Sequence, residues 1–185
     1  MHFFSLLSIM MTSFVLLMED KYGLEQRGER IFMGELVIEC VSPNEAPLQL
    51  LLLADPSERQ LKSYLHRGII YVAKRFERVI GVYVLLETRP NTMEIMNIVV
   101  SEKEQGKGIG KQLLQHAIQT AKGQNMHTLE IGTGNSSVSQ LGLYQKCGFR
   151  MFSIDFDYFS KHYEEEIMEN GIVCRDMIRL TMDLN

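Results

Sequence analysis

The stretch Gln105-Gly106-Lys107-Gly108-Ile109-Gly110-Lys111 lies between two apolar segments of different periodicity, and it decides the fold. Before it, residues 93–100 are dense in β-branched and apolar side chains, which predicts a buried strand. After it, apolar side chains recur at helical spacing with polar ones between them: Leu113, Leu114, Ala117, Ile118 and Ala121. The sequence therefore predicts a strand, a glycine-rich loop and a helix in direct succession.

The glycine-rich loop is predicted to bind an anion. Three glycines remove side chains where a helix begins and where its first backbone N–H groups have no intrahelical partner. A helix N-terminus carries partial positive charge, and glycine lets a pyrophosphate approach the backbone closely. Lys107 and Lys111 add two full positive charges nearby. We therefore expect a nucleotide-type cofactor here, and a glycine-rich helix start without a ligand is the alternative.

The spacing of the glycines excludes two common nucleotide-binding loops. A Walker A loop needs Ser or Thr after its lysine, whereas Lys111 is followed by Gln112. The dinucleotide fingerprint G-x-G-x-x-G fails because the glycines run G-x-G-x-G and lie late in the chain. The pattern Gln105-x-x-Gly108-x-Gly110 instead resembles the acyl-CoA signature Q/R-x-x-G-x-G/A of the GNAT superfamily of N-acetyltransferases.

A second segment strengthens this resemblance. Residues 128–132 are typical of a short strand, and a helical segment after Gly134-Asn135-Ser136-Ser137 ends before Gly148, as a helix often does at a glycine. Tyr144 precedes Gly148-Phe149 by four residues, which resembles the second GNAT signature. The resemblance covers residues 34–185, and the strings IGTGNSS and ENGIVCRDMIRLTMDL are similar to small uncharacterised bacillar members of the superfamily.

The resemblance implies an α/β fold of the GNAT (acyl-CoA N-acyltransferase) type, with a mixed central sheet and helices on both faces. In that fold two central parallel strands splay apart, and the cofactor enters the opening. The hydrophobic pattern itself predicts the order β-α-α-β-β-β-α-β-α-β-β. We expect the first two helices at 44–54 and 56–66, and the last two strands at 149–157 and 172–183.

The resemblance also implies acetyl-CoA as acyl donor and indicates which residues hold it. The strand before the loop would bind the pantetheine arm and the acetyl carbonyl through backbone amides of Ile98, Val99 and Val100. The loop would bind the pyrophosphate through Gln105, Gly106, Lys107, Gly108, Ile109, Gly110 and Lys111. Ser137 stands where the family commonly has a pantetheine-contacting Asn, so Asn135, two residues earlier, is a second candidate contact. No metal site is expected.

Two side chains are the candidate catalytic groups. Acetyl transfer to an amine by direct attack needs a neutral amine, a polarised carbonyl and a stabilised thiolate. Tyr144 matches the family position that donates a proton or a hydrogen bond to the departing thiolate; a core aromatic is the alternative. Glu94, a lone carboxylate in an apolar strand, is the candidate general base because burial would raise its pKa. An exposed Glu near the strand start is the alternative.

Composition narrows the class of acceptor. The net charge is −4, with 45% hydrophobic and 23% charged residues, which fits one globular domain, argues against a nucleic-acid binder and favours a cationic substrate. The segment 158–169 combines aromatic and acidic side chains, which would suit a cationic amine of a small molecule or peptide. A solvated acidic loop is the alternative interpretation of this segment.

Residues 1–33 form an apolar extension, separate from the predicted N-acetyltransferase domain at 34–185. The first 18 residues are almost uninterrupted apolar sequence but lack the basic start and the cleavage site of a secretory signal. An uncleaved membrane anchor is one interpretation, and a start codon assigned too early, with the native start at Met33, is the other. We expect a cytoplasmic protein with little membrane association, because the cofactor is cytosolic and the three cysteines suggest reduced thiols.

Three functions are therefore weighed. The first is an acetyl-CoA-dependent N-acetyltransferase, as a monomer or a homodimer. The second is a non-catalytic regulatory module that binds acyl-CoA, and the third is a membrane-tethered interaction protein. Intact Tyr144 and Glu94 favour the enzyme.

Overall fold

The part of the chain that the structure describes, a computed structural model, is residues 36–185. The expectations for the apolar extension at 1–33, for a native start at Met33 and for a domain boundary at 34 fall outside these residues. Within them, no helix combines the length and the apolar character needed to cross a bilayer.

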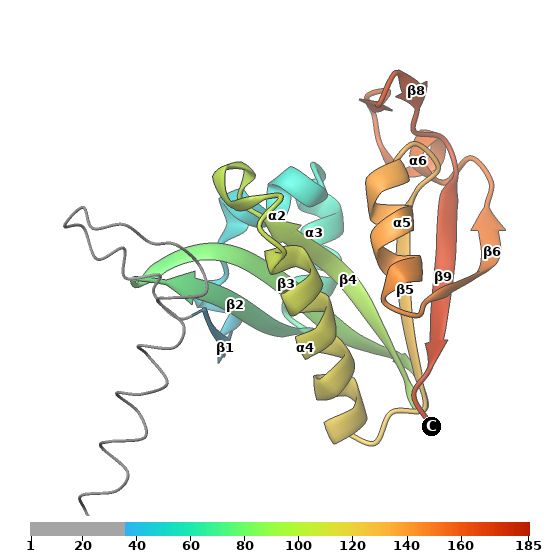
Figure 1. The fold of residues 1–185 in the computed structure, drawn as a ribbon. Coiled ribbons are helices and arrows are strands. Elements are labelled where there is room, and N and C mark those ends of the chain that lie inside the picture. Colours follow the sequence, from blue (N-terminus) through green and yellow to red (C-terminus); the bar gives the residue numbers. More distant parts are fainter. Residues whose placement is uncertain (1–35) are drawn as a thin grey trace, which may run out of the picture. The chain divides into compact units, whose positions relative to one another are not determined.

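A seven-stranded mixed sheet forms the centre of the described residues, in the order β1-β2-β3-β4-β5-β9-β6 (Figure 1). β4 and β5 pair in parallel, and the other neighbours pair antiparallel. The strands are β1 (Val37–Val41), β2 (Ile69–Arg75), β3 (Arg78–Arg89), β4 (Thr92–Val100), β5 (Thr128–Gly134), β6 (Arg150–Asp155) and β9 (Met177–Asp183). A separate hairpin consists of β7 (Met168–Glu169) and β8 (Ile172–Val173).

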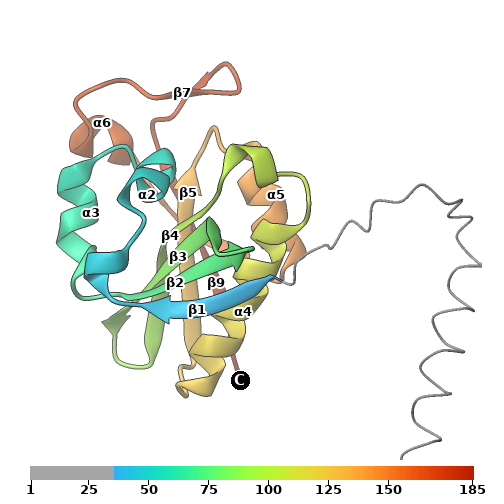
Figure 2. The same cartoon turned by 90° about the vertical axis from the view of Figure 1, so that its left-hand side faces the viewer.

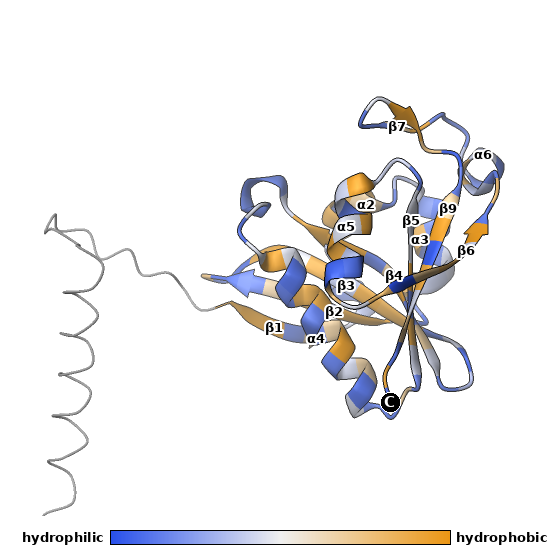
Figure 3. Cartoon of the chain, turned by 45° about the vertical axis from the view of Figure 1, so that its right-hand side comes forward, coloured by the Kyte–Doolittle hydropathy of each residue, from blue (hydrophilic) through white to orange (hydrophobic). Residues whose placement is uncertain are grey.

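Helices cover both faces of the sheet, as expected (Figure 2). α2 (Leu48–Ala54) and α3 (Glu58–Leu65) lie on one face, where Leu51, Leu61 and Leu65 pack in a buried cluster with side chains of β2 and β3. The helices on the other face are α4 (Ile109–Gly123) and α5 (Val138–Lys146). Polar and apolar residues alternate around α4, whose apolar side is buried against the sheet (Figure 3).

The two central strands separate part-way along their length. β4 and β5 pair only from Thr92 to Ile95, whereas β4 stays paired with β3 as far as Val100. Between Ile95 and Asn97 the pairing with β3 shifts by one residue, so Met96 forms a β-bulge. A bulge bends its strand and increases the local twist, and Figure 1 shows the two strands diverging above this point.

Two expected elements differ in their bounds. The helix expected at 44–54 begins only at Leu48, because Pro43–Glu45 form a separate 3-10 turn and Ala46, which precedes Pro47, is extended at ψ 132°. The strand expected at 172–183 is divided into β8 and β9. Between them, the backbone N–H groups of Arg175 and Asp176 donate to Asn135 Oδ1, at 2.8 and 2.9 Å, and not to a strand.

Candidate active site

A cavity of about 570 Å³ lies where β4 and β5 separate. Its walls come from five places: the junction of α2 with α3, the diverging strands, helix α5, the segment that follows β6, and strand β9. The polar and aromatic side chains among its lining include Asp55, Tyr64, Glu94, Asn97, Tyr144, Tyr158, Tyr163, Glu169 and Arg179. The structure therefore brings the two candidate catalytic residues, Glu94 and Tyr144, into one cavity.

Tyr144 lies on α5 and is only 5% exposed. α5 ends as expected, at Gly148 with a left-handed φ of 101°, and the chain then places Phe149 against the Tyr144 ring. Burial raises the pKa of Tyr144, and the carboxylate of Glu169 raises it further. Within residues 36–185 no hydrogen bond engages the Tyr144 hydroxyl, so this group is a neutral donor available to the cavity.

Glu94 lies on β4, and its side chain is 15% exposed, so the buried interpretation holds. Burial raises the pKa of its carboxyl, and Glu130, its direct neighbour on β5, also raises it. Arg179, whose Nη1 lies 3.2 Å from Glu94 Oε1, opposes this rise in pKa. Arg179 is shared, because its Nε also donates to Asp155 at 2.6 Å. Burial and the nearby cation thus shift the pKa of Glu94 in opposite directions, and its role as general base stays a prediction.

The glycine-rich loop has the geometry that its sequence predicts. Gly106 and Gly108 have φ values of 75° and 79°, which side chains rarely adopt, and a Cβ at either would meet open space. Gly108 is the N-cap of α4, so the free N–H groups of the first helical turn begin here. Gln105 ties the loop to β4 by donating from Nε2 to the Val100 carbonyl at 3.0 Å. An open loop of bare backbone at a helix N-terminus fits a pyrophosphate.

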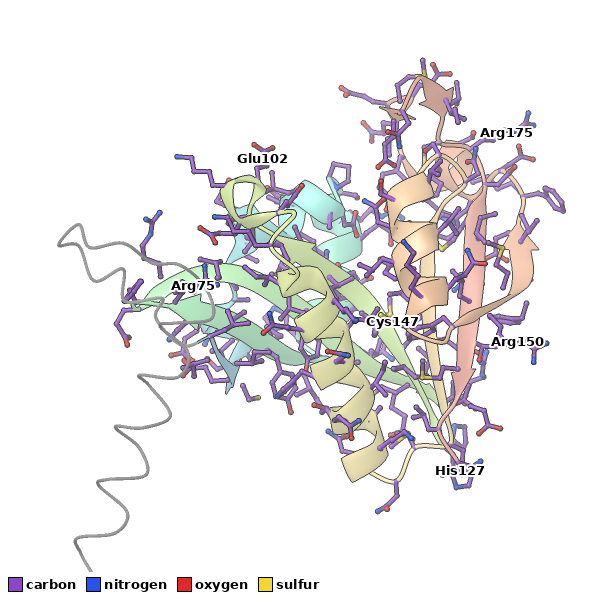
Figure 4. All side chains as sticks on the ribbon, viewed as in Figure 1. Arg75, Glu102, His127, Cys147, Arg150 and Arg175 are labelled. Carbon is purple, nitrogen blue, oxygen red and sulfur yellow. The ribbon has the colours of Figure 1, made fainter. Side chains whose placement is uncertain are left out.

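The two lysines of the loop differ in their surroundings. Lys107 Nζ lies 3.2 Å from Glu104 Oε2, which also accepts from Arg75 at 3.0 Å, so part of the charge of Lys107 is compensated. Lys111, in the first turn of α4, is exposed. Burial raises the pKa of Cys147 near the end of α5, and the charge of Lys111 partly opposes that rise (Figure 4). Their predicted contact with a cofactor stays a prediction.

The other predicted cofactor residues fall into two groups. Ile98, Val99 and Val100 lie on β4 beyond its last partner on β5, and Ile98 lines the cavity. Ser137 also lines it, but its hydroxyl donates to Glu169. The Asn135 amide is occupied at both ends, by the Val173 carbonyl and by the two N–H groups after β8, so it fastens that segment to the end of β5.

The segment after β6 is divided between cavity and surface. It forms α6 (Tyr158–His162) and the β7–β8 hairpin. Tyr158, Phe159, Tyr163 and Glu169 line the cavity as the sequence predicts, whereas His162 and the carboxylates at 164–166 are exposed and lie outside its lining. The alternative of a solvated acidic loop is therefore right for those exposed positions alone.

The sequence profile of the acetyltransferase (GNAT) family matches residues 39–149, more than half of the chain. The chain belongs to the GNAT family. The uncharacterised N-acetyltransferase YvbK of Bacillus subtilis is 55% identical over 155 residues, which cover 84% of this chain and 96% of that protein.

Solved structures of GNAT proteins superpose on this chain. An IAA acetyltransferase from Bacillus cereus is 72% identical, with a TM-score of 0.79 over 80% of this chain and 99% of that one. A GNAT family acetyltransferase from Elizabethkingia anophelis with acetyl-CoA bound is 48% identical, with a TM-score of 0.78 over 80% and 97% of the two chains. The predicted family and fold are confirmed: this GNAT chain is an acetyltransferase, and the expected acyl donor, acetyl-CoA, is the ligand of the Elizabethkingia relative.

The cavity of this GNAT chain also has lining residues that were not among the sequence candidates, and they include Asp55, Tyr64, Asn97 and Arg179. Arg179 has a usable signal, since it is a lone cation in an apolar strand, as Glu94 is a lone anion. Asn97 follows a bulge that periodicity does not reveal. Asp55 and Tyr64 belong to the cavity only because of contacts with residues distant in sequence, so no local sequence pattern predicts them.

Proposed function

We propose that this chain transfers the acetyl group of acetyl-CoA to a primary amine of a small molecule or peptide, by direct attack of the amine on the thioester. The observation that supports this most is the pairing of Glu94 and Tyr144 in one cavity beside the opening between β4 and β5. A carboxylate with a raised pKa accepts a proton, and a neutral phenol donates a hydrogen bond.

Glu94 is proposed as the general base. An alkylamine is protonated at neutral pH and has no lone pair for attack until a proton is removed. Glu94 takes that proton, the nitrogen then bonds to the acetyl carbon, and the carbon–sulfur bond breaks. The nitrogen, which carries a positive charge after the attack, loses its second proton to solvent and leaves a neutral amide. Burial makes Glu94 a stronger base, while Arg179 stabilises its charged form and limits the rise in pKa. The net effect of burial and Arg179 is a carboxylate whose pKa lies closer to the working pH than the pKa of a free Glu.

Tyr144 is proposed as the hydrogen-bond donor to the departing sulfur. Its raised pKa keeps the phenol protonated at physiological pH. Complete proton transfer would run uphill, since a thiol with a reference pKa of about 8.5 is a stronger acid than a phenol of about 10. We therefore assign to Tyr144 the stabilisation of developing negative charge, and the proton reaches the thiolate from solvent.

The loop supports donor binding. Backbone N–H groups at the start of α4 and the bare Gly106 and Gly108 suit the pyrophosphate, and the free edge of β4 at Ile98–Val100 suits the pantetheine arm. The predicted roles of Asn135 and Ser137 are less direct, because their side chains already hold Val173 and Glu169. We propose that they shape the cavity wall that the donor meets.

A cationic acceptor is favoured by the charges that line the cavity. The charged lining residues at 36–185 are three carboxylates, Asp55, Glu94 and Glu169, and one cation, Arg179. Arg179 is also hydrogen-bonded to Asp155, so its charge is shared. Aromatic rings complete the lining, and they attract alkylammonium groups.

We also propose a cytoplasmic location, which suits a cytosolic acyl donor.

We further propose a homodimer formed through β6. This strand is at the edge of the sheet, with Met151 and Phe152 each 51% exposed. An antiparallel pair of β6 strands centred between Phe152 and Ser153 would set Arg150, on the outer side of the protein, opposite Asp155 of the partner subunit (Figure 4). Light scattering tests this: Phe152→Glu should give monomers, and a wild-type monomer would contradict it.

Release of free CoA from acetyl-CoA in the presence of a panel of amines tests the enzymatic proposal. We expect amine-dependent release, with the acetylated amine identified by mass. Release without an acetylated product would mean hydrolysis, and no release with any amine would contradict the function.

A further inference from the structure

Asp55 lies at one end of the cavity, where α2 meets α3, and three tyrosines surround it. Tyr163 donates from its hydroxyl to Asp55 Oδ1 at 3.0 Å, and the Ser57 backbone N–H donates to the same oxygen at 3.1 Å. The Tyr64 hydroxyl also stabilises the charged form of Asp55 and opposes the rise in its pKa that burial causes. Together with Tyr158 these side chains form a cluster, named here the Asp55 pocket, whose tyrosines and carboxylate all line the cavity.

The Asp55 pocket holds an anion without a counter-charge. Within residues 36–185 every partner of the carboxylate is a neutral donor, whereas Glu94 and Asp155 are each paired with Arg179. Neutral donors satisfy hydrogen-bonding capacity but leave the charge uncompensated, and a partly buried charge is costly unless paired. Burial accordingly raises the pKa of Asp55. A ligand that brings a positive charge would relieve that cost.

Aromatic rings give the pocket the second feature of a cation site. Phe159 lies between Tyr158 and Tyr163, with ring centroids 5.3 and 5.4 Å from theirs, so the three rings form a continuous wall. The π faces of such rings attract alkylammonium groups, and more strongly where water is excluded. This wall belongs to the same cavity as Asp55.

Asn97 supplies an independent observation. It is 5% exposed and lines the cavity beside Tyr64. Its Nδ2 donates to the Tyr64 hydroxyl and to the Leu51 carbonyl, both at 3.2 Å, which fixes the orientation of the amide. Its Oδ1 is buried and has no hydrogen-bond partner among residues 36–185. Such an oxygen carries a cost that a ligand N–H would remove.

The Asp55 pocket and the proposed reacting end are adjacent. Tyr158 lines this cavity together with both carboxylates, and burial and the charges of Asp55 and Glu94 raise its pKa. One extended ligand can therefore reach both carboxylates inside one cavity. A single ammonium group could occupy only one of the two places.

We propose that the Asp55 pocket binds a second cationic group of the acceptor, so that the preferred acceptor is an alkyl diamine. The amine that is acetylated lies at Glu94, and the other ammonium lies between Asp55 and the tyrosines. This inference rests on the proposed function for the identity of the reacting end. It goes beyond that function in assigning a charge to the end of the acceptor that does not react.

The test compares acceptors that differ only in the distal group. The probes are α,ω-diaminoalkanes and n-alkylamines of four, five and six carbons. We expect the best diamine to exceed its matched monoamine in kcat/KM by about tenfold or more, a ratio of the size that one cation–π or charge-assisted contact supplies. Asp55→Asn should bring the ratio close to one, mainly by raising KM for the diamine, while monoamine kinetics stay nearly unchanged.

Two further variants separate binding from structure. Tyr163→Phe removes one donor to Asp55 but keeps the ring, so the preference for the diamine should largely persist. Glu58→Gln, at an exposed carboxylate on α3 that pairs with Lys62, is the matched control for loss of one negative charge near the same helix. It should leave the ratio unchanged.

A binding measurement makes the two proposals fail separately. Calorimetric titration of the whole chain with the diamines, without acetyl-CoA, should show binding that Asp55→Asn weakens. Turnover without any diamine preference would overturn the Asp55 pocket and leave the proposed function intact. Diamine binding that depends on Asp55, without turnover of any amine, would overturn the proposed function alone. An equal effect of Asp55→Asn on diamines and monoamines would also overturn the pocket.

Discussion

The two walls of the cavity are built in different ways. The transfer wall consists of β4, β5 and α5, so its residues come from regular elements close together in sequence, and the loop at 105–110 follows β4 outside the cavity lining. The acceptor wall consists of the α2–α3 junction and residues 158–174, and a hydrogen bond between positions 108 residues apart, Asp55 and Tyr163, joins its two parts. Under the proposed function, the chemistry shared by all acceptors would rest on the sheet, whereas the choice of acceptor would rest on a few long-range contacts.

Glu94→Gln should have the largest effect, and it should act on every acceptor alike. Loss of the general base is expected to lower kcat by about 10²–10⁴-fold. Because the pKa of Glu94 is raised, the wild-type rate should fall as the pH drops through that pKa and the base becomes protonated. The variant should lack this acidic limb in a pH–rate profile. Glu166→Gln, at an exposed carboxylate outside the cavity, is the control. If Glu94→Gln kept the full rate with even one amine, the transfer wall would not serve all acceptors alike.

Tyr144→Phe should have the second largest effect, and it should lower kcat by the same factor for every acceptor. Loss of a hydrogen bond to the leaving sulfur is expected to lower kcat by about a hundredfold. The ring and its contact with Phe149 are kept, so calorimetry should find the affinity for acetyl-CoA nearly unchanged. Equal kcat of variant and wild type at saturation would return Tyr144 to the role of a core aromatic.

Gly108→Val should weaken acetyl-CoA binding by about ten- to a hundredfold, because a β-branched residue at φ 79° is strained and would turn the loop. Gly110→Ala is the matched control: its φ is ordinary, and its new Cβ would lie 3.8 Å from Leu143 and 3.9 Å from Val100, which is normal contact. Thermal melting checks that both variants fold. A similar loss of affinity in both variants would mean that the positive φ at Gly108 is not what donor binding requires.

The smallest expected effects are opposite shifts of the acidic limb. Arg179→Gln removes the cation that lowers the pKa of Glu94, so the limb should move to higher pH. Glu130→Gln removes the like charge that raises this pKa, so the limb should move to lower pH. Each shift should be about one pH unit. Shifts in the same direction in the two pH–rate profiles would mean that another group sets the limb.

The sequence predicted the elements of the transfer wall, and the loop and helix beside it, because local rules determine them. Three features are visible within a few residues: glycines where the backbone needs positive φ, a helix with a continuous apolar side, and a helix end at Gly148. Glu94 was singled out as a lone carboxylate in an apolar strand, and the structure places it in the cavity; its role as general base stays a prediction.

The acceptor wall could be predicted only in part. Aromatic and acidic residues at 158–169 indicated its chemistry, but the turn of α6 decides which of them reach the cavity. Asp55 and Tyr64 belong to it only through contacts with distant residues, and Asn135 breaks the last expected strand through its side chain. Such interactions depend on the tertiary fold, which no window of the sequence contains.

The short pairing of β4 with β5 has a mechanical consequence. Only the register from Thr92↔Thr128 to Ile95↔Ile131 joins the block β1–β4 to the block formed by β5, β9 and β6. Within each block neighbouring strands are paired over longer stretches. A force that pulls the two blocks apart therefore meets only four residues of strand pairing, together with the ion pairs Arg179–Glu94 and Arg89–Glu130 that cross between the blocks. The separation that opens a cavity at one end of the sheet thus leaves the strand pairing between the blocks to the other end.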